Sequence, residues 1–300
     1  MDGIVLRIAA GYPPAVEAQS PEPIVDPATA ERWRKVLSGE DPGMHRLRGL
    51  LRAIPSAPRC KQCNSPFGGI GGPVMRLVGK APWEKNPNFC GQCFTMLQRQ
   101  FGGAEIELSM LFADVRGSTS LAERVGTRSF TDLLNRFYRN AAELVIGRDG
   151  LVDKFVGDEV VALFAPGWAG REHARRAIEA ADAILVATGH GGGSAPWLPV
   201  GAGVHTGVAY VGTVGAAGVV TDFTALGDPV NATARLASSA AAGTILVSDD
   251  AATAAGLDVS GLTASALELR GRAEPMPAYV LTAGSSAARL ATPERGAAPP

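Results

Sequence analysis

Strand and helix patterns alternate along the second two-thirds of the chain, which restricts it to folds built around one sheet. IELSMLFADV (106–115) is an apolar run of strand length, and SLAERVGTRSFTDLLNRFYRNAAELVIGR (120–148) repeats its apolar residues with the period of a helix. Further strands are expected within 151–164, 200–215, 244–249 and 277–282, and helices over 173–188 and 228–240. The predicted fold class is therefore α+β, a mixed sheet flanked by helices.

Composition sets few limits on function. A hydrophobic content of 46% with 19% charged residues is ordinary for a globular protein. The net charge of −1 provides no overall attraction to nucleic acid or anionic lipid. No run approaches eighteen apolar residues, and the first residues lack the pattern of a signal peptide. A cytoplasmic protein without a membrane span is expected.

The chain divides into four segments by composition. They are a partly helical N-terminal segment (1–57), a cysteine module (58–100), the alternating domain (104–282) and a disordered tail (283–300). In the first segment a helix is expected to begin at Pro27, with Asp26 as its N-cap, and to end at Gly39. After Pro42 a second helix is expected, with Leu47, Leu50, Leu51 and Ile54 on one face. That face is expected to dock on the rest of the protein, and a membrane or partner contact is the alternative.

The cysteines form two C-x-x-C pairs, Cys60 with Cys63 and Cys90 with Cys93. In a reducing compartment this pattern favours metal thiolates over disulfides, and paired knuckles fit a tetrahedral zinc site with four cysteine ligands. The same ligands would suit a rubredoxin-like iron site. CGQC alone resembles a redox dithiol, but no strand-then-helix pattern surrounds it. Structural zinc is the favoured interpretation.

Two carboxylates stand at turns next to apolar strands. Asp114 ends a strand and precedes a turn containing Gly117, Ser118 and Thr119 that opens a helix, where backbone N–H groups can face an anion. Asp158 occupies the turn between two expected strands. Either residue alone is typical of a simple turn or cap. Together they provide the hard oxygen ligands that Mg²⁺ and Mn²⁺ prefer, beside a turn that suits phosphate.

Asn231 and Arg235 lie four residues apart in an expected helix, so their side chains project from the same face. Arginine offers a fixed fork of donors to phosphate oxygens, and asparagine offers both a donor and an acceptor. An isolated pair of this kind would be an ordinary solvated face. Combined with the carboxylates, it suits phosphoryl chemistry, in which catalysis is mostly positioning and charge neutralisation.

These motifs occur together in one known family. The chain from about residue 106 to 281 resembles the catalytic domain of class III nucleotidyl cyclases, the adenylyl and guanylyl cyclases. The matching motifs are FADVRGST (112–119), KFVGDEV (154–160), GVHTG (203–207) and TALGDPVNATARL (224–236), in the family's order and with similar spacing. Any one of them would be a weak signal, whereas the combination is specific.

The resemblance implies that two Mg²⁺ or Mn²⁺ ions bind Asp114, Asp158 and the Val115 carbonyl. It also implies that the turn of Gly117, Ser118 and Thr119 contacts the substrate phosphates. In the family, two chains pair head to tail and share each active site. This chain is therefore expected to act as a homodimer, with no nucleic acid partner.

The other chain would supply the residues that bind the rest of the nucleotide. Lys154 and Thr224 match the two positions that read the purine. Asn231 would orient the ribose, and Arg235 would stabilise charge on the α-phosphate.

Contacts to the triphosphate depart from the family pattern at one point. Many members carry an arginine two residues before the GVHTG motif, where this chain has Gly201. The family's late basic residue, which meets the terminal phosphate, is matched by either Arg270 or Arg272. Arg116, inside the phosphate turn, could compensate for the missing arginine.

The implied reaction is cyclisation of ATP to 3′,5′-cyclic AMP with release of pyrophosphate. Adenine N1 is an acceptor and suits the Lys154 ammonium, whereas guanine N1 carries a hydrogen and would oppose it. A guanylyl cyclase is the nearest alternative because Thr224 can donate or accept. A nucleotide-binding signalling module without turnover is a second alternative. The intact Asp114, Asp158, Asn231 and Arg235 argue against it, because a degenerate module would be expected to lose some of them. A zinc-dependent nucleic-acid adaptor is disfavoured by the near-zero net charge.

Overall fold

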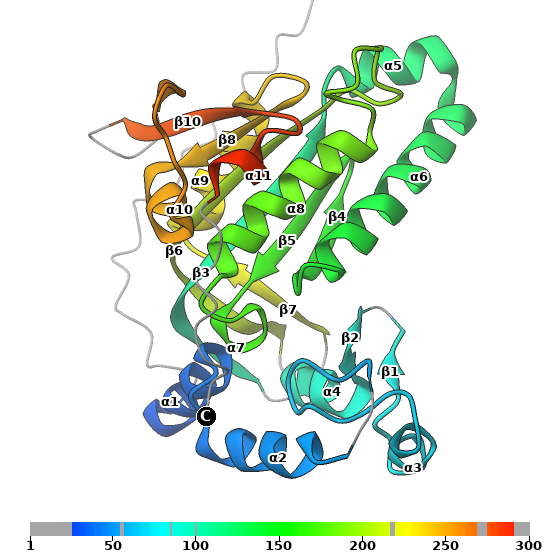
Figure 1. The fold of residues 1–300 in the computed structure, drawn as a ribbon, viewed down its shortest axis with the longest axis vertical. Coiled ribbons are helices and arrows are strands. Elements are labelled where there is room, and N and C mark those ends of the chain that lie inside the picture. Colours follow the sequence, from blue (N-terminus) through cyan, green and yellow to red (C-terminus); the bar gives the residue numbers. More distant parts are fainter. Residues whose placement is uncertain are drawn as a thin grey trace, which may run out of the picture.

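The computed structural model describes residues 26–54, 57–84, 86–99, 101–216, 220–268 and 275–290. Within these residues a large sheet forms the centre of the molecule (Figure 1). Its strands are β3 (Gly102–Val115), β4 (Leu151–Val156), β5 (Glu159–Phe164), β6 (Val200–Ala216), β7 (Val220–Leu226), β8 (Thr244–Ser248), β9 (Thr263–Leu267) and β10 (Met276–Thr282). The order is β4-β5-β3-β6-β8-β10-β9, and β7 pairs with β6. Because β6 and β8 are parallel and the other pairs antiparallel, the predicted mixed sheet is confirmed.

Helices cover this sheet. They are α5 (Ser118–Val125), α6 (Thr127–Ile146), α7 (Pro166–Ala169), α8 (His173–Ala187), α9 (Asp228–Ser239), α10 (Asp249–Ala255) and α11 (Ser286–Arg289). The alanine-rich α8 packs on β3 and β6, and α6 packs beside α8 (Figure 1). The helix α9 packs over Gly203 of β6 and has its own apolar cluster with β8 and β10. Successive residues of a strand face opposite sides, so β6 is covered on both faces.

The described parts of the N-terminal segment and of the cysteine module lie together beneath one end of the sheet (Figure 1). Their elements are α1 (Pro27–Ser38), α2 (Pro42–Arg52), α3 (Gly71–Leu77), β1 (Pro82–Trp83), β2 (Asn86–Cys90) and α4 (Gly91–Arg99). The predicted first helix is confirmed, because Asp26 accepts from the N–H groups of Ala28 and Thr29, and Gly39 ends the helix in a left-handed conformation. Met44 and Leu47 of α2 pack against the cysteines, whereas Leu50 is exposed.

Two local features differ from the expected pattern. The helix-periodic stretch 120–148 is broken at Gly126, whose φ of 81° separates α5 from α6. Residues 286–289, assigned to the tail, form α11, and Leu290 after it is buried. Residues 291–300 of the expected tail lie outside the described residues. None of the helices in the described ranges combines the length and apolar character needed to span a membrane.

Candidate active site and cysteine metal centre

Strand pairing brings the two predicted metal carboxylates together. Asp114 near the end of β3 is in register with Glu159 at the start of β5, and Asp158 immediately precedes Glu159 in the turn from β4. Gly157 has a φ of 61°, a conformation that favours glycine in so tight a turn. The Tyr138 hydroxyl of α6 donates to the Gly157 carbonyl and anchors the turn. Asp158 therefore lies close to Asp114, and its charge acts on that carboxyl.

The electrostatics of this cluster fit a cation site. Burial, followed by Asp158, raises the pKa of Asp114, although Arg116 opposes the shift. Burial and the charges of Asp114 and Asp158 raise the pKa of Glu159 to about 7. Three crowded carboxylates are stabilised in their ionised form by a divalent cation, which takes such oxygens as ligands. The donor set therefore suits Mg²⁺ or Mn²⁺.

Arg116 is directed at the carboxylate rather than toward open space. Its guanidinium forms an ion pair with Asp114, and its Nη1 donates to the Ser238 carbonyl at 2.7 Å. Ser238 belongs to the last turn of α9, so Arg116 ties the phosphate turn to that helix. The geometry places Arg116 as a counter-charge of Asp114, and a phosphate contact would require it to leave this carboxylate.

The predicted phosphate turn has the expected form. Gly117 is left-handed, with a φ of 64°, and immediately precedes α5. A side chain at this position would point into open space, so the backbone is accessible from outside. The first N–H groups of α5, from Ser118 and Thr119, have no intrahelical acceptor by geometry. They lie a few residues from Asp114 and can face an anion held there.

Lys154 and Thr224, the predicted base-reading pair, are brought together by two strands that are not neighbours in the sheet. The Lys154 ammonium of β4 is 2.8 Å from Asp222 and 3.8 Å from Asp153. The Thr224 hydroxyl of β7 donates to Asp153 at 2.7 Å. Asp153 and Lys154 follow each other in β4 at a β-bulge, because Val152 pairs with Ala162 and Lys154 with Val161. Bulges re-aim side chains and are common beside functional sites.

The helix with Asn231 and Arg235 is seated by glycines of β6. A Cβ at Gly203 would lie 2.3 Å from the Ala237 nitrogen of α9, so the helix can approach the strand only over a glycine. Gly201 is similarly covered, because a Cβ there would lie 2.7 Å from the Ala240 carbonyl oxygen. This backbone leaves no space for the arginine that many class III cyclases carry at that position.

Asn231 and Arg235 are both exposed on α9. Among the described residues, no hydrogen bond or ion pair of either side chain is found, and none joins them to Asp114 or Asp158. Within a single chain, the structure therefore does not assemble all four residues into one site. Arg270 and Arg272 lie outside the described residues. His205 of the GVHTG motif is buried and bonds Ser248 at 2.8 Å, which suits a structural role.

The four cysteines form a closed cluster. Cys60, Cys63, Cys90 and Cys93 are all buried, and their sulfurs lie within 4.8 Å of one another. The Cys63 and Cys90 sulfurs are 3.8 Å apart. A tetrahedral metal with bonds of ~2.3 Å to sulfur would place its ligands roughly 3.8 Å apart, so the spacing fits such an ion.

The surroundings of the thiols also suit metal thiolates. The Cys90 N–H donates to the Cys60 sulfur at 3.2 Å, and the Lys80 ammonium lies 3.8 Å from the Cys63 sulfur. Because cysteine binds a metal as the thiolate, a metal must displace the thiol protons to bind. The four residues can hold a metal ion, and tetrahedral sulfur coordination does not by itself separate zinc from iron.

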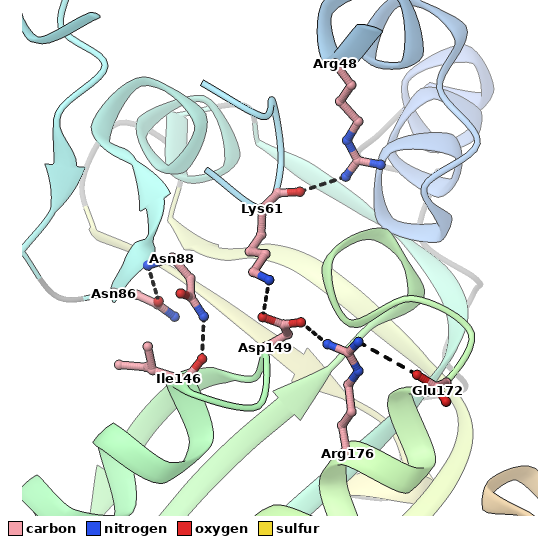
Figure 2. A network of polar contacts seen from close by, with 8 residues as sticks. All are labelled: Arg48, Lys61, Asn86, Asn88, Ile146, Asp149, Glu172 and Arg176. Carbon is pink, nitrogen blue, oxygen red and sulfur yellow. Dashed lines mark hydrogen bonds and ion pairs between the residues drawn. The ribbon is translucent and has the colours of Figure 1, made fainter. Parts of the chain in front are cut away.

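The cysteine module is joined to the sheet domain by polar and aromatic contacts. The ammonium of Lys61, which lies between the first two cysteines, is 2.6 Å from the Asp149 carboxylate, and Arg176 of α8 contacts the same carboxylate (Figure 2). Asn88 donates to the Ile146 carbonyl at the end of α6, at 2.5 Å. Arg48 of α2 bridges the carbonyls of Lys61 and Gly167.

Sequence reasoning missed three acidic residues of the site, namely Asp153, Glu159 and Asp222. Asp153 shows which part of the site was visible in the sequence and which was not. A charged residue inside an apolar strand segment, directly before Lys154, is a visible signal. The bulge that turns both side chains toward β7 depends on pairing between strands and leaves no mark in the sequence.

Comparison with known proteins agrees with this geometry. Residues 104–283 match the family described as the adenylate and guanylate cyclase catalytic domain. An adenylate cyclase of Anabaena cylindrica is 32% identical over 135 residues, 43% of this chain and 26% of the relative. An adenylate cyclase of Rhizobium meliloti is 30% identical over 144 residues, 45% of this chain and 22% of the relative. An uncharacterized protein of Mycobacterium tuberculosis is 35% identical over 138 residues, 46% of this chain and 25% of the relative. The chain thus spans about a quarter of the length of these relatives.

Two solved structures share the fold. The guanylyl cyclase Cya2 is similar with a TM-score of 0.56 and 27% identity, covering 63% of this chain and all of that one. The adenylyl cyclase CyaB from P. aeruginosa is similar with a TM-score of 0.53 and 26% identity, covering 61% of this chain and 98% of that one. With its matched region exceeding half of its length, and with the carboxylate pair, phosphate turn and α9 motif in place, the chain belongs to the adenylate and guanylate cyclase catalytic domain family.

Proposed function

We propose that this protein is an adenylyl cyclase that converts ATP to 3′,5′-cyclic AMP and pyrophosphate. The observation that carries the proposal is the convergence of Asp114 and Asp158 at one end of the sheet beside the phosphate turn. The ribose 3′-hydroxyl would attack the α-phosphorus, and the bond from the α-phosphorus to the oxygen of the leaving pyrophosphate would break.

Asp114, Asp158 and the Val115 carbonyl would hold divalent metals. When bound, these metals neutralise phosphate charge and lower the pKa of the ribose hydroxyl. The N-terminus of α5 would orient the phosphates. The exposed Asn231 and Arg235 would bind the ribose and the α-phosphate, with the arginine fork stabilising charge that grows during the displacement.

A homodimer with shared sites is part of the proposal. Asn231 and Arg235 are exposed on α9, and among the described residues neither side chain forms a hydrogen bond or ion pair with the carboxylates, which suits a ligand held by a second chain. Exposed apolar side chains lie on the same strands as the base-reading pair. They are Phe155 and Val156 of β4 and Leu226 of β7. Apolar surface beside a functional site suits burial against a partner.

ATP is proposed as the substrate because the Lys154 ammonium can donate to adenine N1. The ammonium has three hydrogens. The carboxylates of Asp222 and Asp153 face two of them, which leaves the third for adenine N1. A guanylyl cyclase is the competing candidate, and the family includes both activities. The cysteine cluster is proposed to hold a structural Zn²⁺, since four buried thiolates form a closed site.

The test is product analysis of the purified chain with ATP or GTP, in the presence of Mg²⁺ or Mn²⁺. Cyclic AMP as the main product supports the proposal. Cyclic GMP as the main product would contradict the assigned base preference, and no cyclic product under any condition would contradict the catalytic role.

A further inference from the structure

Asp153 is a buried carboxylate whose role is not explained by packing. Its side chain is only 3% exposed, and among the described residues its Oδ1 has no hydrogen-bond partner. A buried carboxylate oxygen without a partner lowers stability, so an aliphatic residue would serve the strand better if packing were the only demand. Lys154 does not account for Asp153 either, because its ammonium lies closer to Asp222.

The contact that singles out Asp153 is the one with Thr224. A hydroxyl carries one hydrogen and can accept through its oxygen. An ionised carboxylate only accepts, so the Thr224 hydrogen must point at Asp153, at 2.7 Å. The other acceptor within reach, the Ala225 carbonyl, is 3.5 Å away and weaker. Toward a ligand, Thr224 can then present only a lone pair.

We propose that Asp153 is a positioning residue that sets base specificity by fixing the Thr224 hydroxyl as an acceptor toward the purine. Adenine carries an amino donor on C6, which matches a lone pair, whereas guanine carries a carbonyl acceptor on C6, which does not. Thr224 retains 5% exposure, so a base that reaches it does so with little water to relieve a mismatch. This inference rests on the proposed nucleotide site and deepens it.

The experiment compares Asp153→Asn with Asp222→Asn in the full chain. Both changes remove one negative charge near Lys154, but only the first frees the Thr224 hydrogen, because an amide can donate as well as accept. The ratio of kcat/KM for ATP to that for GTP should fall about tenfold in Asp153→Asn and clearly less in Asp222→Asn, which removes the charge closer to Lys154 but leaves the Thr224 hydrogen on Asp153. In a Thr224→Val background, Asp153→Asn should have no further effect on the ratio.

Equal ratios in wild type and Asp153→Asn, or the same fall in the Thr224→Val background, would overturn the proposal. Affinities for ATP and GTP analogues that cannot cyclise, measured by calorimetry, provide a readout that does not need turnover. A shifted affinity ratio without any cyclic product would uphold Asp153 and contradict the cyclase activity. Cyclic AMP formation with an unshifted affinity ratio would uphold the cyclase activity and contradict the role of Asp153.

A second inference rests on the contacts of the cysteine module. The module contacts β7, which carries Thr224, and the turn that leads into β4, which carries Lys154. On one side, Lys61 and Asn88 bind the turn between α6 and β4, through Asp149 and the Ile146 carbonyl (Figure 2).

On the other side, β7 is held through Phe223, the residue before Thr224. Its ring lies 6.3 Å from Phe94 of α4 and 6.1 Å from Trp33 of α1. The Thr213 hydroxyl of β6, in register with Phe223, donates to the Leu97 carbonyl of α4 at 2.8 Å. We call these contacts of Lys61, Asn88, Phe94 and Leu97 the clamp. We infer that a metal in the cysteine cluster holds the clamp in place, so that metal occupancy controls nucleotide affinity.

The test uses Lys61→Met, which cuts the clamp without touching a thiol, with Lys80→Met as the matched control. Lys80 lies beside the cluster but contacts Cys63 rather than the turn between α6 and β4. With metal content verified by its release to a colorimetric chelator, KM for ATP should rise about fivefold in Lys61→Met only, with kcat retained. Cys93→Ser should raise KM further if it folds. An unchanged KM in Lys61→Met, or an equal rise in the Lys80→Met control, would overturn the clamp.

Discussion

The molecule carries two sets of residues suited to metal ions, and they are built in opposite ways. The cysteine cluster draws four buried ligands from a stretch of 34 residues, Cys60 to Cys93, within one module. The carboxylate site draws two partly exposed ligands, Asp114 from the end of β3 and Asp158 from the turn between β4 and β5, and leaves the rest to substrate. A closed set of ligands uses the metal to hold the fold, and an open set uses it for chemistry. The predictions below test that contrast.

The largest effect is expected at the open site. Asp114→Ala should lower cyclase activity by roughly 100- to 1000-fold, because it removes a ligand that positions charge against the phosphates. The melting temperature should not fall, since the substitution also relieves crowding with Asp158. Activity assays and thermal unfolding check both points, with the exposed Asp132→Ala as a control. A large loss of stability would show that Asp114 belongs to the fold instead.

Sharing of the open site between chains gives the next test. Asp114→Ala and Arg235→Ala should each be nearly inactive, whereas an equimolar mixture should recover about a quarter of wild-type activity. Half of the randomly paired dimers would then contain one variant of each kind, and each of these would hold one complete site of two. No recovery after subunit exchange, verified by differently tagged chains, would exclude shared sites.

At the closed site the expected effect is on stability. Cys60→Ser should lower the melting temperature by about 5–10 °C and lose the bound metal, because metal binding at such sites contributes to folding. Elemental analysis of the purified chain should find one zinc per chain, and chelation followed by excess Mg²⁺ should reproduce the effect. Metal-free wild type with an unchanged melting temperature would contradict a structural role.

The smallest effect is a pH dependence of base preference. Burial raises the pKa of Asp153 to about 6, with Thr224 and Lys154 opposing the shift and Asp222 adding to it. Because the pKa is raised, the carboxylate that fixes Thr224 is present above pH 6 and is lost as the pH falls through that value. The preference for ATP over GTP should therefore decline severalfold from about pH 8 to about pH 5.5 in wild type. In Asp153→Asn the preference for ATP over GTP should not change with pH. The same pH dependence in wild type and in Asp153→Asn would contradict the role of the Asp153 carboxylate.

The two sites also differ in what the sequence could predict. The cysteine ligands are visible as C-x-x-C pairs, because both ligands of each knuckle are local. Asp114, Asp158 and the phosphate turn were predictable because each ends or joins an apolar strand. The mixed sheet could be predicted from the spacing of apolar residues. The break between α5 and α6 at Gly126 could not, because the helical spacing of apolar residues continues across it.

Side-chain contacts that depend on tertiary structure could not be read from the sequence. The ion pair of Arg116 with Asp114 depends on side-chain directions at a turn, and the approach of Asp153 to Thr224 depends on a bulge. The clamp of Lys61 on Asp149 joins residues 88 positions apart. In each case local propensity is satisfied by many arrangements, and tertiary packing selects one of them.

The most direct test of the account is the identity of the cyclic product and its dependence on the open site. Purified wild-type chain should convert ATP to 3′,5′-cyclic AMP and pyrophosphate only when Mg²⁺ or Mn²⁺ is present, and Asp114→Ala should lower product formation by roughly 100- to 1000-fold while keeping the fold. A chain that retains bound zinc and a cooperative unfolding transition, yet forms no cyclic nucleotide from ATP or GTP with either metal, would contradict the proposed catalytic role.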